Sequence, residues 1–278
     1  MSRLSAVEPL LRHPRYEVIP SDAIEDAVVS SVPRDVTLTV TASPTKGLEA
    51  TIALAQRLSE HGFTVVPHLS ARLVVDDQHL EDVVAQLRAS AIDDVFVPAG
   101  DADPPAGRFD SALSLLIRLD EMGRPFSRMG ITGYPQSHPN IDDDVTVQAM
   151  WDKRHYATYI VSNLCFDPSV VRRWVKRVRA RGVTLPIYFG LAGPVERTKL
   201  LTMATKIGVG ESARFLSGHA EWFLRMGAPG GYNPSRLLAR TSATLRDPAS
   251  DVEGLHVFTF NQVRQTEQWR QGLLATLA

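Results

Sequence analysis

Short apolar runs alternate with longer amphipathic segments from one end of the chain to the other. The short runs are rich in β-branched and aromatic residues, which is typical of buried strands. We therefore predict strands over 16–19, 36–41, 64–66, 94–98, 129–133, 159–164, 185–191 and 255–260. In the longer segments the apolar residues recur at helical spacing. This pattern predicts helices over 21–31, 48–61, 77–89, 111–122, 145–155, 168–181, 196–207 and 262–277.

Several predicted helix ends carry residues suited to capping. The candidate N-caps, whose side chains accept from free backbone N–H groups, are Ser21-Asp22, Asp76-Asp77 and Asp167-Pro168. The glycines placed for a left-handed residue just past a helix are Gly62, Gly123 and Gly182. These signals set the expected boundaries of the helices.

Eight strands, each followed by a helix, indicate a parallel barrel closed on itself. We predict an α/β fold, a single (β/α)8 TIM barrel, with residues 1–278 forming one catalytic domain. Extra helices are expected between the seventh and eighth strands, over 211–226 and 234–245. The alternative, an open doubly wound sheet, is disfavoured because no G-x-G-x-x-G follows the first strand.

The composition narrows the class of protein. The 278 residues carry a formal net charge of −1, with 44% hydrophobic and 22% charged residues, which disfavours a nucleic-acid binder that neutralises phosphates. A single cysteine, Cys165, excludes an internal disulfide framework and a cysteine-cluster metal site. No apolar run approaches the ~20 residues needed to cross a bilayer, and the first residues do not resemble a secretory signal. We expect a cytoplasmic enzyme with no nucleic-acid or membrane partner.

In a barrel of this kind the active site lies at the carboxyl ends of the strands, so polar residues there are candidates. Glu17 lies inside the first predicted strand, where burial is expected to raise its pKa toward that of a general acid. The alternative is a structural Glu17 paired with Arg15 or Arg72. Asp101 ends the fourth strand and is either a site carboxylate or a turn residue.

His68, after Pro67, is a further candidate, although a lone histidine is more often structural than catalytic. No H-x-H or H-E-x-x-H is present, so we predict no metal site.

A series of short motifs coincides with the predicted strand ends. They are Tyr16-Glu17-Val18-Ile19-Pro20, Val40-Thr41, Pro67-His68-Leu69-Ser70, Gly100-Asp101, Gly133-Tyr134-Pro135-Gln136-Ser137-His138-Pro139, Cys165-Phe166-Asp167 and Leu255-His256-Val257-Phe258-Thr259-Phe260-Asn261. In this order and spacing they resemble the catalytic barrel of the methylenetetrahydrofolate reductase family over nearly the whole chain.

The resemblance implies reduction of 5,10-methylenetetrahydrofolate to 5-methyltetrahydrofolate, in one-carbon metabolism and methionine biosynthesis. Glu17 matches the family's general acid, which protonates N10 so that the bridged ring opens to an N5 iminium. Asp101 matches a carboxylate that binds the pterin and favours the cation. Asn163 stands where the family has glutamine. Thr41 and Tyr134 are expected to contact substrate as well as cofactor.

The resemblance also implies a flavin, FAD, contacted at Thr41, His68 and Tyr134, but the sequence departs from the family around it. The family's Arg-Gly-Asp, whose arginine serves the dinucleotide phosphates, is replaced by Ala99-Gly100-Asp101, and Thr41 is followed by Ala42-Ser43-Pro44. We therefore predict no tightly bound flavin and direct hydride transfer from NADH or NADPH.

Two further segments have both functional and structural interpretations. Gly208 and Gly210 precede a predicted helix and could bind the nicotinamide dinucleotide phosphates, or they form a glycine cap. The basic run 172–181 has apolar residues at helical spacing, which predicts a solvated outer helix; binding of a polyglutamate tail is the alternative.

Two other functions stay open. One is a barrel lyase or aldolase that uses Glu17 and Asp101 for proton transfer, although no lysine for a Schiff base lies in a predicted strand. The other is a folate-binding relative without catalysis.

Overall fold

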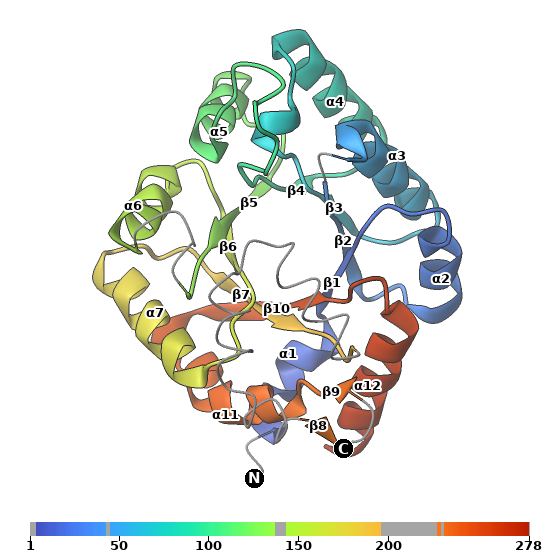
Figure 1. Cartoon of the computed structure of the whole chain (residues 1–278), viewed down its shortest axis with the longest axis vertical. Helices are drawn as coiled ribbons and strands as arrows, with labels where there is room; N and C mark the ends of the chain where they lie inside the picture. The colour runs from blue at the N-terminus through green and yellow to red at the C-terminus, as the bar shows by residue number, and fades with distance from the viewer. Residues whose placement is uncertain (1–3, 43–44, 137–142, 196–226, 229–230, 278) are drawn as a thin grey trace.

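Eight parallel strands form the centre of the protein (Figure 1), in a computed structural model that describes residues 4–42, 45–136, 143–195, 227–228 and 231–277. The strands are β1 (Arg15–Val18), β2 (Thr37–Val40), β3 (Val65–Pro67), β4 (Asp94–Phe96), β5 (Arg128–Gly133), β6 (Tyr159–Ser162), β7 (Ile187–Ala192) and β10 (Val252–Phe258). Their order is β3-β2-β1-β10-β7-β6-β5-β4. A parallel bridge between His68 and Phe96 joins the two end strands. The predicted TIM barrel is confirmed.

Helices surround the strands, as Figure 1 shows. They are α2 (Ile24–Ser31), α3 (Gly47–Glu60), α4 (Asp77–Ala89), α5 (Ala112–Glu121), α6 (Asp143–Lys153), α7 (Pro168–Ala180), α11 (Ser235–Arg246) and α12 (Val263–Ala275). Shorter elements are η1 (Ser5–Val7), α1 (Glu8–Arg12), η2 (Ala71–Leu73), η3 (Pro248–Ser250) and an antiparallel pair, β8 (Gly227–Ala228) with β9 (Gly231–Tyr232). Helix α11 is one of the extra helices predicted between the last two barrel strands; 196–207 and 211–226 lie outside the described residues. None of the described helices is both long and apolar enough to cross a membrane.

The helix caps follow the sequence in most places. Asp76 accepts a hydrogen bond from the backbone of His79, and Asp167 from Ser169. Gly62, Gly123 and Gly182 have φ of +82°, +83° and +78° and end their helices as expected. The predicted cap at Ser21-Asp22 is wrong.

Helix α2 begins later than predicted because the chain before it is fixed by Asn261. The Asn261 side chain accepts from the Ile19 N–H and donates to the Ile19 carbonyl and to Ser21 Oγ. These bonds hold Ser21 beside the last barrel strand, and Ala23 becomes the N-cap residue without a side-chain bond.

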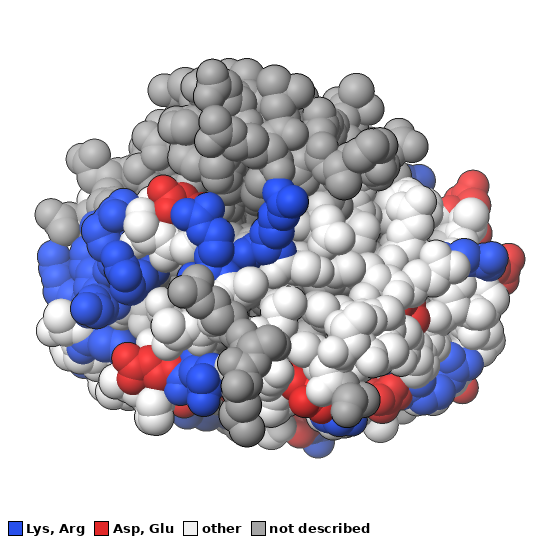
Figure 2. Space-filling view, turned by 90° about the horizontal axis from the view of Figure 1, so that it is seen from below, with Lys and Arg blue, Asp and Glu red and all other residues white. Residues whose placement is uncertain are grey.

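Helix α7 carries the basic run on its outer face. Its apolar residues Val171, Trp174, Val175 and Val178 are buried, whereas Lys176, Arg172 and Arg173 are exposed and Arg177 and Arg179 are half-buried. Seen from below, Lys and Arg side chains gather at the left, over α7 and the neighbouring α11 (Figure 2). The predicted outer helix is confirmed.

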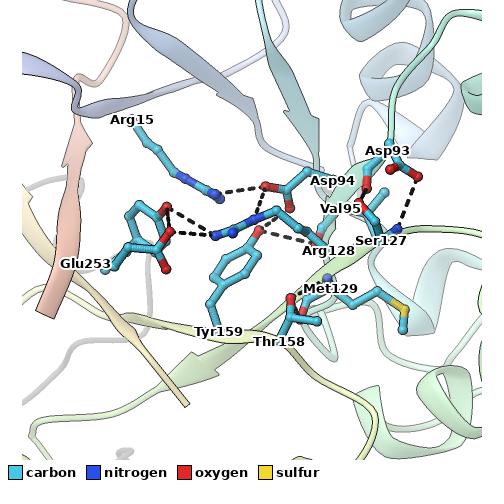
Figure 3. A network of polar contacts seen from close by, with 11 residues as sticks. Arg15, Asp93, Asp94, Val95, Ser127, Arg128, Met129, Thr158, Tyr159 and Glu253 are labelled. Atoms are coloured by element: carbon cyan, nitrogen blue, oxygen red, sulfur yellow. Dashed lines mark hydrogen bonds and ion pairs between the residues drawn. The ribbon is translucent and has the colours of Figure 1, made fainter. Parts of the chain in front are cut away.

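A buried polar network closes the amino-terminal end of the barrel (Figure 3). Arg15 donates to Asp94 at 2.8 Å, and its guanidinium lies 4.4 Å from the centre of the Tyr159 ring. Tyr159 donates to the other Asp94 oxygen at 2.7 Å. Arg128 on β5 pairs with Asp94 on the neighbouring β4 and with Glu253 on β10. Arg15 is thereby engaged at the opposite end of β1 from the candidate site.

The interior above this network is apolar. Tyr159 belongs to a cluster with Val66, Phe96, Val161 and Tyr188. Phe96 and Val161 also line the cavity at the carboxyl end. The cluster therefore forms the floor on which the candidate site lies.

Candidate functional site

A cavity of about 480 Å³ opens at the carboxyl ends of the strands. Most of the candidate residues line it. They are Glu17 (β1), Thr41 (after β2), His68 (after β3), Asp101 (after β4), Tyr134 (after β5) and Asn163 (after β6). The fold thus gathers six residues from six different strands around one cavity, at the end of the barrel where ligands bind.

Glu17 lies between two histidines. Its Oε2 is 3.0 Å from His256 Nε2 and 3.8 Å from His68 Nε2, so only His256 is within hydrogen-bond distance. The Glu17 side chain is 14% exposed and the His256 side chain 2%. An ionised carboxylate only accepts hydrogen bonds, so the hydrogen of this contact is on His256 Nε2.

The sequence predicts a raised pKa for Glu17, and this prediction is wrong. Burial does raise it, but the hydrogen bond that His256 donates, together with the proximity of the two histidine rings, outweighs burial and holds the Glu17 pKa below its ordinary value. The sequence shows the apolar neighbours of Glu17 along its own strand, but not the partner on β10. Neither Arg15 nor Arg72 pairs with Glu17, since they pair with Asp94 and Asp103.

His68 is buried beside Glu17 without a hydrogen bond to its Nε2. Burial lowers the pKa of His68 to about 4, against the opposing effect of Glu17. The imidazole is therefore neutral at physiological pH. Its ring packs edge-on against Phe96 with centroids 4.7 Å apart, and His68 is one of the residues that line the cavity.

Asp101, Tyr134 and Asn163 form the opposite side of the cavity. Asp101 is exposed at the rim. Burial and the Asp101 charge both raise the pKa of Tyr134, which stays a neutral phenol. The Asn163 Oδ1 accepts from the Leu164 N–H at 2.8 Å, so its amide hydrogens are the groups left to donate to a ligand. This side of the cavity offers donors and a carboxylate acceptor to one planar polar molecule.

The protein-family model described as methylenetetrahydrofolate reductase matches residues 21–211, more than half of the 278 residues. The chain belongs to the methylenetetrahydrofolate reductase family. The match confirms the family resemblance, and the motifs at 16–20 and 255–261 lie outside the matched residues.

Solved structures similar to this family member share its fold at low identity. One is an uncharacterized protein from Clostridium thermocellum that binds two copies of 5-methyl-5,6,7,8-tetrahydrofolic acid; the identity is 12%, the TM-score 0.57, and 95% of this chain and 94% of that chain are covered. Another is the C-terminal domain of a protein provisionally described as a chitinase from Desulfitobacterium hafniense DCB-2, with 12% identity, a TM-score of 0.51, and 96% and 98% covered. A third, provisionally described as a phosphonomutase from Burkholderia cenocepacia J2315, has 9% identity, a TM-score of 0.52, and 99% and 98% covered. At these identities the matches show the barrel fold.

Family membership raises the question of a flavin. Thr41, His68 and Tyr134 line the cavity and offer polar groups to a ring system. The position that the resemblance associates with the flavin phosphates is Ala99, which has no charged group. Gly100 has a φ of +88°, and a Cβ there would lie 1.8 Å from Ser70 Oγ, so the turn needs glycine whatever the ligand. The cavity suits a ring system but lacks the phosphate contact at residue 99.

Sequence reasoning gave His256, Ser70 and Arg72 no role in binding a ligand. All three line the cavity. His256 could have been found from the alternation along β10, because His256 and Phe258 face the cavity while Leu255 and Val257 belong to the outer core. Ser70 and Arg72 lie beyond the end of β3, where no periodic pattern applies.

Gly208 and Gly210 lie outside the described residues. The described residues hold no group of three or more His, Cys, Asp or Glu side chains arranged to bind a metal ion.

Proposed function

We propose that this protein reduces 5,10-methylenetetrahydrofolate to 5-methyltetrahydrofolate with hydride taken directly from NADH or NADPH. A proton passes to N10, the C–N10 bond breaks, and the N5 iminium that results accepts a hydride at its methylene carbon. The products are 5-methyltetrahydrofolate and the oxidised nicotinamide. The observation that carries the proposal is that Glu17 and Asp101 line one cavity in a chain of this family.

Glu17 is the proposed donor of the proton, and His256 is its hydrogen-bond partner at 3.0 Å. The Glu17 pKa is lowered in the free site, so Glu17 does not hold a proton there at neutral pH. A folate lying over Glu17 excludes water, which disfavours the charged carboxylate and raises the Glu17 pKa, so that Glu17 takes up the proton that it passes to N10.

The opposite side of the cavity is the proposed pterin site. The Asp101 carboxylate accepts two hydrogen bonds from the amidine edge of the pterin and stabilises the cation electrostatically. The Asn163 amide hydrogens and the Tyr134 and Thr41 hydroxyls bind its remaining polar atoms. His68 lines the cavity beside Glu17, and its ring is the proposed contact for the nicotinamide. The proposed reaction involves no flavin, in keeping with Ala99.

The experiment that tests the reaction combines three measurements on the purified protein. NADH or NADPH oxidation is followed with and without 5,10-methylenetetrahydrofolate, the methyl product is identified, and the visible spectrum is recorded after incubation with FAD and gel filtration. We expect folate-dependent oxidation and no stoichiometric flavin spectrum. A stoichiometric flavin spectrum contradicts direct transfer, and absence of the methyl product contradicts the reductase.

A folate-binding protein without turnover is the second candidate. The similar structure from Clostridium thermocellum binds two copies of a reduced folate. In addition, the Glu17 pKa is lowered, whereas a general acid at neutral pH needs a raised one. Glu17→Gln separates the two candidates. The reductase loses activity on this change while folate binding persists, whereas the binding protein has no nicotinamide oxidation to lose.

A further inference from the structure

Arg72 is held beside the turn that carries Asp101. It lies in η2, directly after β3, and its N–H donates to the Ala99 carbonyl at 2.9 Å. The Arg72 carbonyl accepts from the Ala106 N–H at 2.9 Å. These bonds fix the backbone of Arg72 between the two ends of the loop that follows β4.

The side chain of Arg72 brings positive charge to an acidic cavity. Among the described residues that line it, Arg72 carries the one Lys or Arg side chain, while Glu17, Asp101 and Asp103 are acidic. Both reactants of the proposed function are anions, through the phosphates of the dinucleotide and the glutamate carboxylates of the folate. Because the lining carries more negative than positive side chains, the cavity repels both anions unless Arg72 contacts one of them.

The hydrogen-bonding capacity of Arg72 is mostly unused within the protein. Its Nε is buried and has no hydrogen-bond partner. Its Nη2 lies 3.3 Å from Asp103 Oδ1, and the Asp103 side chain is 89% exposed. Such an exposed, long ion pair contributes little to stability. A second oxyanion can therefore replace Asp103 at small cost.

We propose that Arg72 binds an oxyanion of one reactant, either a phosphate of the nicotinamide dinucleotide or a glutamate carboxylate of the folate, in exchange for Asp103. This inference rests on the proposed function and adds to it the charged contact at the rim. A guanidinium can present two N–H groups in parallel to two oxygens of a phosphate or carboxylate, and the Nη2 group of Arg72 lies toward the rim beside Asp103. The Arg72 backbone lies next to Ala99, which is in the connection that follows the neighbouring strand β4.

The test compares Arg72→Met with Asp103→Asn. If Arg72 only fixes the loop through Asp103, the two changes have the same effect. If Arg72 binds a reactant, Arg72→Met weakens binding and Asp103→Asn, which removes the competing carboxylate, leaves binding equal or tighter. Arg72→Lys keeps the positive charge but loses the planar pair of N–H donors, and we expect it to lose less affinity than Arg72→Met.

Binding of NADH, NADPH and 5-methyltetrahydrofolate with one or several glutamates is measured separately by titration calorimetry, after thermal unfolding has shown that each variant folds. We expect Arg72→Met to weaken the binding of one reactant by on the order of 10- to 100-fold. Loss confined to the nicotinamides identifies a phosphate, and loss confined to the folates identifies a glutamate carboxylate. Equal weakening by Arg72→Met and Asp103→Asn, or unchanged binding in Arg72→Met, overturns the inference alone. A wild-type protein that binds neither reactant overturns the proposed function and the inference with it.

Discussion

The lowered pKa of Glu17 depends on His256, and replacing His256 with leucine tests this dependence. His256 Nε2 lies 3.0 Å from Glu17 Oε2 in a buried contact. A hydrogen bond to a charged group contributes ~1.5–3 kcal/mol, and one pH unit of pKa corresponds to about 1.4 kcal/mol. Without the bond, burial acts on Glu17 with less opposition. We therefore expect His256→Leu to raise the Glu17 pKa by about one to two pH units.

The pKa is measured by carbon-13 NMR titration of protein labelled at the glutamate carboxyl carbon, with the Glu17 signal assigned from Glu17→Gln. His68→Leu is the matched control, because His68 Nε2 is 3.8 Å from the same oxygen and makes no hydrogen bond to it. Above about pH 4 His68 is neutral, so its removal changes the Glu17 pKa less. An unchanged Glu17 pKa in His256→Leu, or an equal rise in both variants, refutes the assignment of His256 as the controlling partner.

Two further predictions concern stability. The His68 pKa falls from 6.5 to about 4 on folding, so between these pH values the unfolded chain binds a proton that the folded protein does not. Stability is therefore fully present above pH 6.5 and falls as the pH drops toward 4, by at most roughly 3 kcal/mol from this group. The free energy of unfolding in urea should differ less between pH 7 and pH 5 for His68→Gln than for the wild type. An identical difference in the two proteins contradicts the buried neutral histidine. Asp94→Asn keeps an acceptor oxygen but removes the negative charge that lies 2.8 Å from the buried Arg15, and we expect a loss of about 3–5 kcal/mol of unfolding free energy. Asp120→Asn, which breaks the exposed pair with Arg124, is the control, and equal losses in the two variants would show that the buried network does not stabilise the barrel.

The sequence was sufficient for the barrel because each of its eight strands carries its own local signal. Helix α4 shows the same for a helix: Asp76 caps it, and the predicted range 77–89 agrees with the observed helix at both ends. Parallel strands buried on both faces are short apolar runs, so their existence is visible without knowledge of their neighbours. Helix α2 shows the limit, since its start is set by Asn261 from the far end of the chain.

The site was predicted less completely because its chemistry depends on contacts between distant strands. Glu17 is conspicuous as a carboxylate in an apolar strand, yet its pKa is set by His256, which lies 239 residues further along the chain. Arg72 was considered only as a partner of Glu17, because nothing in its local sequence shows that it lies beside Ala99 and in the same cavity. Residue type and strand position predict which groups face the cavity, whereas pairing requires the closed barrel.

The central claim is direct transfer of hydride from a nicotinamide to the methylene carbon of the folate. It is tested by incubating the flavin-free protein with 5,10-methylenetetrahydrofolate and NADH or NADPH that carries deuterium on the transferred position, followed by mass spectrometry of the product. Direct transfer predicts 5-methyltetrahydrofolate with one deuterium in its methyl group for the wild type. It also predicts a rate on the order of 10²- to 10⁴-fold lower for Glu17→Gln. A methyl group without deuterium, or no methyl product at all, contradicts it.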